Sequence, residues 1–134
     1  MEHDTYPHGE IDFDGIVSAL LTTDTVDLIR LNIWHSILAE HRHLYPEQRK
    51  VHEIAGVPLI KTIDWSQRPH FARTQWYRDL LAKYVEPGTR IWIEHVMYGE
   101  VIKSGWEKFK LMVYAPEGDM TRSGHTDGRH WRVA

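Results

Sequence analysis

The spacing of apolar residues changes once along the chain, near Gly88, and this change constrains the fold more than any other feature. Before Gly88, apolar residues recur every three or four positions, which is the period of a helix that buries one face. After Gly88 they recur at every second position, which is the period of a strand. The sequence therefore predicts helices first and a small antiparallel sheet of about three strands last, an α+β arrangement.

Four helices are expected in the first part, and one of them should be long and central. Residues 24–43 carry apolar residues on two sides of a helix, such as Ile29 on one side and Leu31 on the other. A helix that is apolar on two sides lies between two layers, and this one would be roughly 30 Å long. Asp12 or Asp14 should cap the first helix. The other three helices are expected at residues 12–21, 46–55 and 69–84.

Three strands are expected after Gly88. Residues 90–98 alternate with apolar groups on both faces, which is typical of an interior strand. Residues 108–114 alternate more cleanly, so one face of this strand should be wet. Trp131 and Val133 should supply a short last strand.

Size and composition predict one domain spanning residues 1–134, with an acidic N-terminal arm. The chain has 134 residues, of which 42% are hydrophobic and 26% charged, enough for one continuous core. It has no cysteine, which excludes disulfides and thiolate metal sites and fits a reducing compartment. No apolar run reaches the ~18 residues of a membrane span, so a cytoplasmic protein without membrane contact is expected.

The acidic arm is the first candidate binding surface. Residues 1–27 contain seven Asp or Glu residues and no Lys or Arg. The arm would present a negative field to a basic partner. Alternatively, its charges are neutralised within the fold by residues 65–83, whose net charge is +3. The arm residues expected to meet a partner are Asp4, Glu10, Asp12 and Asp14.

A second candidate surface lies at the start of the helix expected at residues 69–84, where cations alternate with aromatic residues. Arg68, His70 and Arg78 should be exposed there and should meet an anionic or aromatic partner surface. Arg73 projects onto the apolar face of this helix, so it should pair with a carboxylate in the core, for example Glu40.

The third candidate is a metal site near the C-terminus. Asp127-Gly128 is a strong signal for a two-residue hairpin turn, which would place His125 opposite His130. Two imidazoles with the Asp127 carboxylate could hold Zn²⁺ and leave one coordination position open for water. The alternative is a polar surface hairpin without any cofactor.

None of the common catalytic motifs occurs: the P-loop, the Gly-x-Gly-x-x-Gly loop, His-Glu-x-x-His and Gly-x-Ser-x-Gly are all absent. We therefore expect a small non-enzymatic binding protein, an accessory or inhibitor-type module that docks on a larger protein or protein–nucleic-acid machine. Its partner should be a protein rather than free nucleic acid, and its oligomeric state stays open.

Two alternatives to this binding function remain. One is a small metal-dependent hydrolase that uses the C-terminal His and Asp residues. The other is a winged-helix-like DNA-binding protein, with residues 69–84 as the reading helix and 90–114 as the wing.

Overall fold

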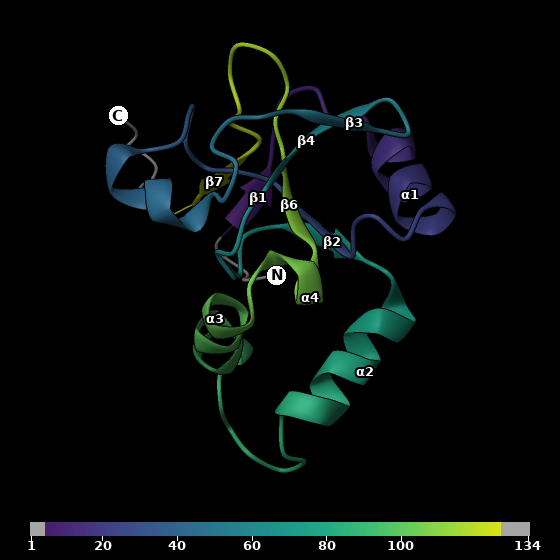
Figure 1. Ribbon diagram of the computed structural model, residues 1–134, viewed down its shortest axis with the longest axis vertical. Helices are drawn as coiled ribbons and strands as arrows, with labels where there is room; N and C mark the ends of the chain where they lie inside the picture. Colours follow the sequence, from purple (N-terminus) through teal and green to yellow (C-terminus); the bar gives the residue numbers. More distant parts are fainter. Residues whose placement is uncertain (1–4, 127–134) are drawn as a thin grey trace.

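The computed structural model describes residues 5–126, and in this part of the chain most of the strands precede the last three helices, with two strands after them (Figure 1). The strands are β1 (Thr5–Pro7), β2 (Leu28–Arg30), β3 (His52–Ile54), β4 (Val57–Lys61), β5 (His70–Ala72), β6 (Leu111–Tyr114) and β7 (Ser123–His125). The helices are α1 (Phe13–Thr22), the 3-10 helix η1 (Ala39–Leu44), α2 (Thr74–Tyr84), α3 (Ile93–Ser104) and α4 (Trp106–Phe109).

The main sheet has five strands in the order β3-β4-β6-β2-β5. The neighbours β2 and β6 are parallel, and the other neighbouring pairs are antiparallel, so the sheet is mixed. A separate two-stranded sheet joins β1 to β7. Because β5 comes last in the order, it forms one edge of the main sheet.

Helix α1 covers one face of the main sheet. Ile16 and Leu20 of α1 are buried in the same apolar cluster as Ile29 of β2 and Met112 of β6. Asp12 caps this helix, because its Oδ1 accepts a hydrogen bond from the Gly15 main-chain N–H at 2.9 Å, as the sequence predicts.

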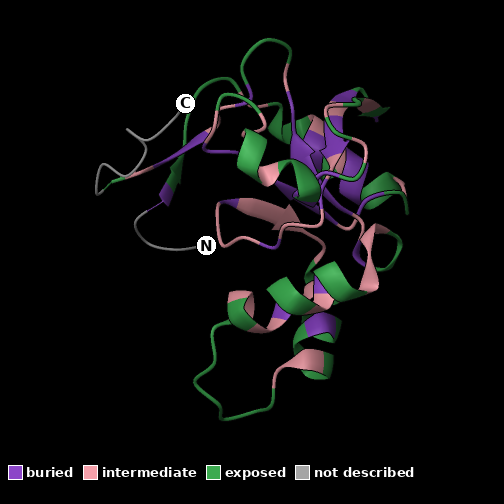
Figure 2. Ribbon diagram, turned by 60° about the vertical axis from the view of Figure 1, so that its left-hand side comes forward, coloured by how far each residue is buried: buried purple, intermediate pink, exposed green. Residues whose placement is uncertain are grey.

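The opposite face of the sheet is covered in two parts. Helices α2, α3 and α4 lie below the sheet in Figure 1 and bury Leu80, Met97 and Phe109 against Leu28 and Leu111. The segment that includes η1 covers the other part. In Figure 2 the central strands are buried, whereas β5 is only partly buried. The cluster under η1 contains Leu44, Tyr45, Ile60, Val113, Ala115 and Met120.

The expected order, helices followed by about three antiparallel strands, is wrong. The structure intersperses strands among helices, and the main sheet has five strands of mixed direction. The strands are only three to five residues long. So short a segment shows no readable period when both of its faces are buried.

The long central helix expected at residues 24–43 is the largest of these errors. This stretch contains β2, an irregular segment and η1. All three residues of β2 are buried, because the strand lies inside the sheet with covers on both faces. A strand buried on both faces and a helix apolar on two sides give the same continuous apolar pattern.

The strand expected at residues 90–98 is also wrong, because α3 begins at Ile93. Met97 and Val101 are buried one turn apart, while Tyr98 and Ile102 are exposed. Apolar residues on both the inner and the outer face of the helix produced the apparent alternation. Residues 90–114, which would form the wing in the winged-helix alternative, are therefore mostly helical.

Three smaller expectations have mixed outcomes. Residues 46–55 form turns and β3 instead of a helix, and residues 108–114 form the end of α4 followed by β6. The expected helix at residues 69–84 starts only at Thr74, because the residues before it pair with β2 as strand β5. The strand expected at Trp131 and Val133 lies outside the described residues.

Within residues 5–126, no helix is both long and apolar enough to span a lipid bilayer.

Candidate functional site

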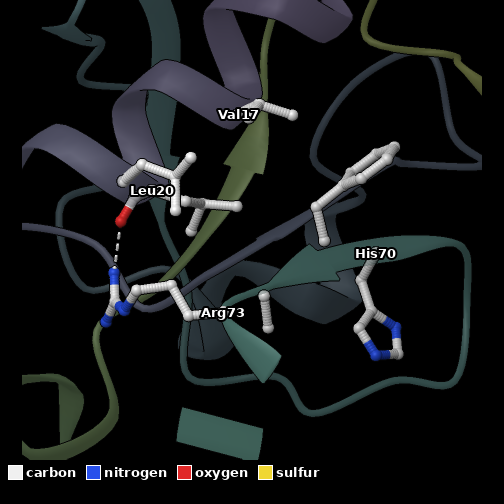
Figure 3. Close-up of a pocket in the computed structure, with 7 residues that line it drawn as sticks. Val17, Leu20, His70 and Arg73 are labelled. Carbon is white, nitrogen blue, oxygen red and sulfur yellow. Dashed lines mark hydrogen bonds between the residues drawn. The ribbon is translucent and has the colours of Figure 1, made fainter. Parts of the chain in front are cut away.

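A groove of about 290 Å³ lies between α1 and the edge strand β5 (Figure 3). Its α1 wall consists of Val17, Leu20 and Leu21. Figure 3 shows Val17 and Leu20 on the helix side, with His70 and Arg73 across from them. The β5 wall consists of His70, Phe71, Ala72 and Arg73.

An exposed apolar stripe follows α1 along this groove. Phe13, Val17 and Leu21 are 48%, 46% and 70% exposed, and they are spaced four residues apart, on one side of the helix. The Phe13 ring meets the Phe71 ring edge to face, with 5.8 Å between the centroids. Single exposed apolar side chains are ordinary, whereas three on one side of a helix beside a groove form a candidate docking surface. We call these three residues the α1 stripe.

Within residues 5–126, the β5 wall has main-chain hydrogen-bonding groups without a partner. The Leu31 N–H donates to the Pro69 carbonyl at 2.9 Å, and hydrogen-bonded pairs alternate along an antiparallel ladder. The main chain of Phe71 therefore faces β2, and the N–H and C=O groups of His70 and Ala72 face outward. No hydrogen bond within residues 5–126 uses these outward groups. The edge can accept another strand.

Arg73 fixes the two walls relative to each other. Its Nη1 donates to the Leu20 carbonyl at 2.7 Å and to the Val26 carbonyl at 3.1 Å, and its Nη2 pairs with the Asp27 carboxylate. Burial raises the pKa of Asp27, although Arg73 opposes this shift. The partner of Arg73 is thus Asp27 rather than the suggested Glu40, which is exposed on η1.

His70 contributes to the β5 wall, but its ring lies on the face of the sheet away from α1, against Trp65 and Tyr77. Its ring stacks on Tyr77 at 5.8 Å between centroids, and its Nδ1–H donates to the Arg68 carbonyl at 2.8 Å. Burial lowers the pKa of His70, so the ring is neutral at pH 7 and its Nε2 is an acceptor.

The other two members of the expected basic surface are not brought to this groove. Arg78 is exposed on α2 and lines no part of it. Arg68 is half-buried, and its Nη1 donates to the Ser66 hydroxyl at 3.1 Å. Burial and the nearby Arg30 guanidinium lower the pKa of Arg68 to about 10.

No sequence pattern predicts the buried ion pair that lies beside Arg68. Arg30 of β2 is only 2% exposed, and its Nη1 contacts the Asp64 carboxylate at 2.8 Å and the Asp64 carbonyl at 3.1 Å. Its Nη2 donates to the Tyr45 hydroxyl at 3.0 Å. Burial alone would raise the pKa of Asp64, but the Arg30 charge and hydrogen bond hold it below its ordinary value. The ion pair connects the segment that follows β4 to the interior strand β2.

Only some of the residues expected in the acidic arm and in the metal site lie within residues 5–126. Glu10, Asp12 and Asp14 are exposed at the N-terminal end of α1, next to the Phe13 end of the stripe, and Asp4 lies outside the described residues. His125 belongs to β7, where it is opposite Thr5 of β1. Residues 5–126 contain no group of three His, Asp or Glu residues able to hold a metal. The other proposed ligands, Asp127 and His130, lie outside this range.

A second side-chain contact links His35 to Asp119 on the surface. Their Nδ1 and Oδ1 atoms are 2.8 Å apart, both side chains are 53% exposed, and the Thr121 main-chain N–H donates to the same carboxylate oxygen at 2.9 Å. The Thr121 N–H, with a smaller contribution from His35, lowers the pKa of Asp119 to about 2. Because this pKa is lower in the folded than in the unfolded protein, the carboxylate contributes its full stability at a pH above the pKa of the unfolded state. That contribution is lost as the pH falls toward 2.

The structure predicts which of these two contacts lowers the pKa of Asp119 more. His35→Ala should leave this pKa well below its ordinary value, because the Thr121 N–H remains. Thr121→Pro should raise it more, because proline has no N–H. Carboxyl ¹³C shifts of Asp119 followed by NMR over acidic pH measure both changes. A larger rise in His35→Ala than in Thr121→Pro would assign the shift to His35 instead.

The chain matches no protein-family model, no curated protein and no solved structure.

Proposed function

We propose that the protein is a non-enzymatic protein-binding module that holds an extended segment of a partner protein between α1 and β5. One observation carries this proposal: the exposed α1 stripe borders the edge of β5 that pairs with no other strand of residues 5–126. An added strand would form main-chain hydrogen bonds with His70 and Ala72. Because successive side chains of a strand point to opposite faces, every second partner side chain would reach the apolar groove.

Charge indicates what should flank the apolar part of the partner segment. Glu10, Asp12 and Asp14 are exposed near one end of the α1 stripe, and Asp24 is exposed beyond the other end. Lys110 and Arg122 approach the two ends, where they donate to the Asp24 carbonyl at 3.0 Å and the Glu10 carbonyl at 2.7 Å, but no ion pair within residues 5–126 engages these four carboxylates. The preferred segment thus has apolar residues at alternate positions and Lys or Arg at its ends. An accessory or inhibitor protein that docks on a larger protein fits this binding mode.

The proposal predicts that Val17→Asp and Leu21→Asp abolish segment binding without unfolding the protein. Each change places a charge against the apolar partner side chains, and both positions are exposed, so stability should change by less than about 0.5 kcal/mol. Phage-displayed random peptides selected on the wild-type protein provide the probe. Peptides with apolar residues at alternate positions should be enriched and should bind either variant at least tenfold more weakly.

Ile102→Asp is the matched control, because Ile102 is 42% exposed on α3, away from the groove. It should bind the selected peptides as tightly as the wild type does. Equal binding by Leu21→Asp and the wild type would contradict the proposed function.

A further inference from the structure

A second cavity, of about 190 Å³, opens between α2 and α4 and is separate from the α1–β5 groove. Trp76, Asp79 and Lys83 face it from α2, because their spacing of three and four residues places them on one side of the helix. Lys108 and Phe109 face it from α4. The cavity therefore combines flat aromatic walls, one carboxylate and two ammonium groups.

The two lysines converge on one tyrosine in this cavity. The Nζ atoms of Lys83 and Lys108 lie 5.3 and 5.7 Å from the centre of the Tyr84 ring. The nearby Lys108 and Lys83 ammonium groups hold the pKa of Tyr84 below its ordinary value, and the buried Tyr84 hydroxyl has no hydrogen-bond partner within residues 5–126. Two ammonium groups near one ring repel each other, and an anion between them would relieve this repulsion. The cavity thus favours a ligand with a negatively charged group such as phosphate.

The other lining groups narrow the class of ligand. The Asp79 carboxylate lines the cavity, and the Gln75 amide donates to it at 2.8 Å. A carboxylate is a poor neighbour for a phosphate but a good acceptor for sugar hydroxyls, which is how acidic residues bind ribose in dinucleotide sites. Trp76 offers an aromatic face for a base, because stacking on such faces holds nucleic-acid bases.

We propose that this cavity binds a single ribonucleotide. The phosphate lies between Lys83 and Lys108, the ribose hydroxyls donate to Asp79, and the base stacks against Trp76. Enclosed sites for whole drug-sized ligands have volumes of roughly 300–1,000 Å³, so this smaller cavity would leave part of the nucleotide in solvent. A phosphotyrosine side chain offers phosphate and a ring but no hydroxyls for Asp79, so the site should prefer the nucleotide.

Isothermal titration calorimetry with AMP tests this proposal on the full-length protein. AMP should bind at least tenfold more tightly than adenosine, inorganic phosphate or phosphotyrosine. Lys83→Gln and Lys108→Gln should each weaken AMP binding at least fivefold. Asp79→Ala should reduce the preference for AMP over 2′,3′-dideoxy-AMP, since it removes the acceptor for the hydroxyls.

Lys103→Gln is the matched control, because Lys103 is exposed on α3 and does not line the cavity. It should leave AMP binding unchanged, and circular dichroism should show that all four variants are folded. Absence of AMP binding at millimolar concentration would overturn the proposal. So would equal weakening by Lys83→Gln and Lys103→Gln, or phosphotyrosine binding as tight as that of AMP.

Discussion

Replacement of Asp64 with alanine should lower the free energy of unfolding by ~3–5 kcal/mol, the typical cost of leaving a buried charge without its partner. The charge left behind is Arg30, which is 2% exposed in the middle of the main sheet. Urea denaturation of the wild type and the variant measures the difference. Glu53→Ala, which removes an exposed carboxylate from β3, is the control and should change stability by less than about 0.5 kcal/mol.

A double variant separates the loss of this interaction from the cost of the stranded charge. Arg30→Met with Asp64→Leu removes both charges and should be more stable than Asp64→Ala alone, because apolar residues can replace a buried ion pair. The recovery should be partial, because Arg30→Met leaves the main-chain carbonyl of residue 64 and the Tyr45 hydroxyl without the donor that Arg30 supplies. A double variant less stable than Asp64→Ala would show that Arg30 matters mainly through its packing and its contact with Tyr45.

The Asp64 pair also makes a prediction about pH. Arg30 holds the pKa of Asp64 below its ordinary value of 3.8, so folding favours the charged carboxylate. The resulting stability is complete above the unfolded pKa and is lost as the pH falls below it. Below pH 4 the wild type should therefore lose stability more steeply than Asp64→Ala does.

Arg73→Ala should lower the free energy of unfolding by about 3 kcal/mol, the second largest effect that we expect. It leaves Asp27, which is 14% exposed, without its ion-pair partner, and it leaves the Leu20 and Val26 carbonyls without a donor. Urea denaturation measures this loss as well. Because Arg73 joins the two walls of the groove, the variant should also bind the selected peptides more weakly.

Arg78→Ala is the control for Arg73→Ala, since Arg78 is exposed on the same helix. It should change stability by less than about 0.5 kcal/mol. The loss in Arg73→Ala should shrink at acidic pH, because burial raises the pKa of Asp27 and a protonated Asp27 needs no cationic partner. Equal losses for the two arginines, or a loss independent of pH, would contradict the role assigned to Arg73.

The position of Arg73 illustrates how far the sequence predicts the site. The expected partly buried cation with an acidic partner is present, although Arg73 directly precedes α2 and does not lie on its apolar face. The expected partner, Glu40, was wrong. The actual partner, Asp27, lies 46 residues away in the chain. A helical projection shows which way a side chain points on its own element and carries no information on what another element brings to it.

The α1 stripe was missed for a related reason. The sequence places Phe13, Ile16, Val17 and Leu20 on one face of a helix, and all four are equally apolar candidates for the core. In the structure Ile16 and Leu20 are buried, whereas Phe13 and Val17 are exposed along the groove. Which part of an apolar face is covered depends on the width of the sheet beneath it, and here the sheet ends at β5.

The sequence by itself determined the elements whose signals are local. Asp12 and the helical period that follows it define α1, and the apolar face from Trp76 to Tyr84 defines most of α2, because caps and periods act within a few residues. Only the tertiary structure decided that residues 24–43 contribute a buried strand and that β5 is left as an edge. Hydrogen bonds between strands join residues far apart in sequence, so a short strand is stable only beside partners that the local pattern does not reveal.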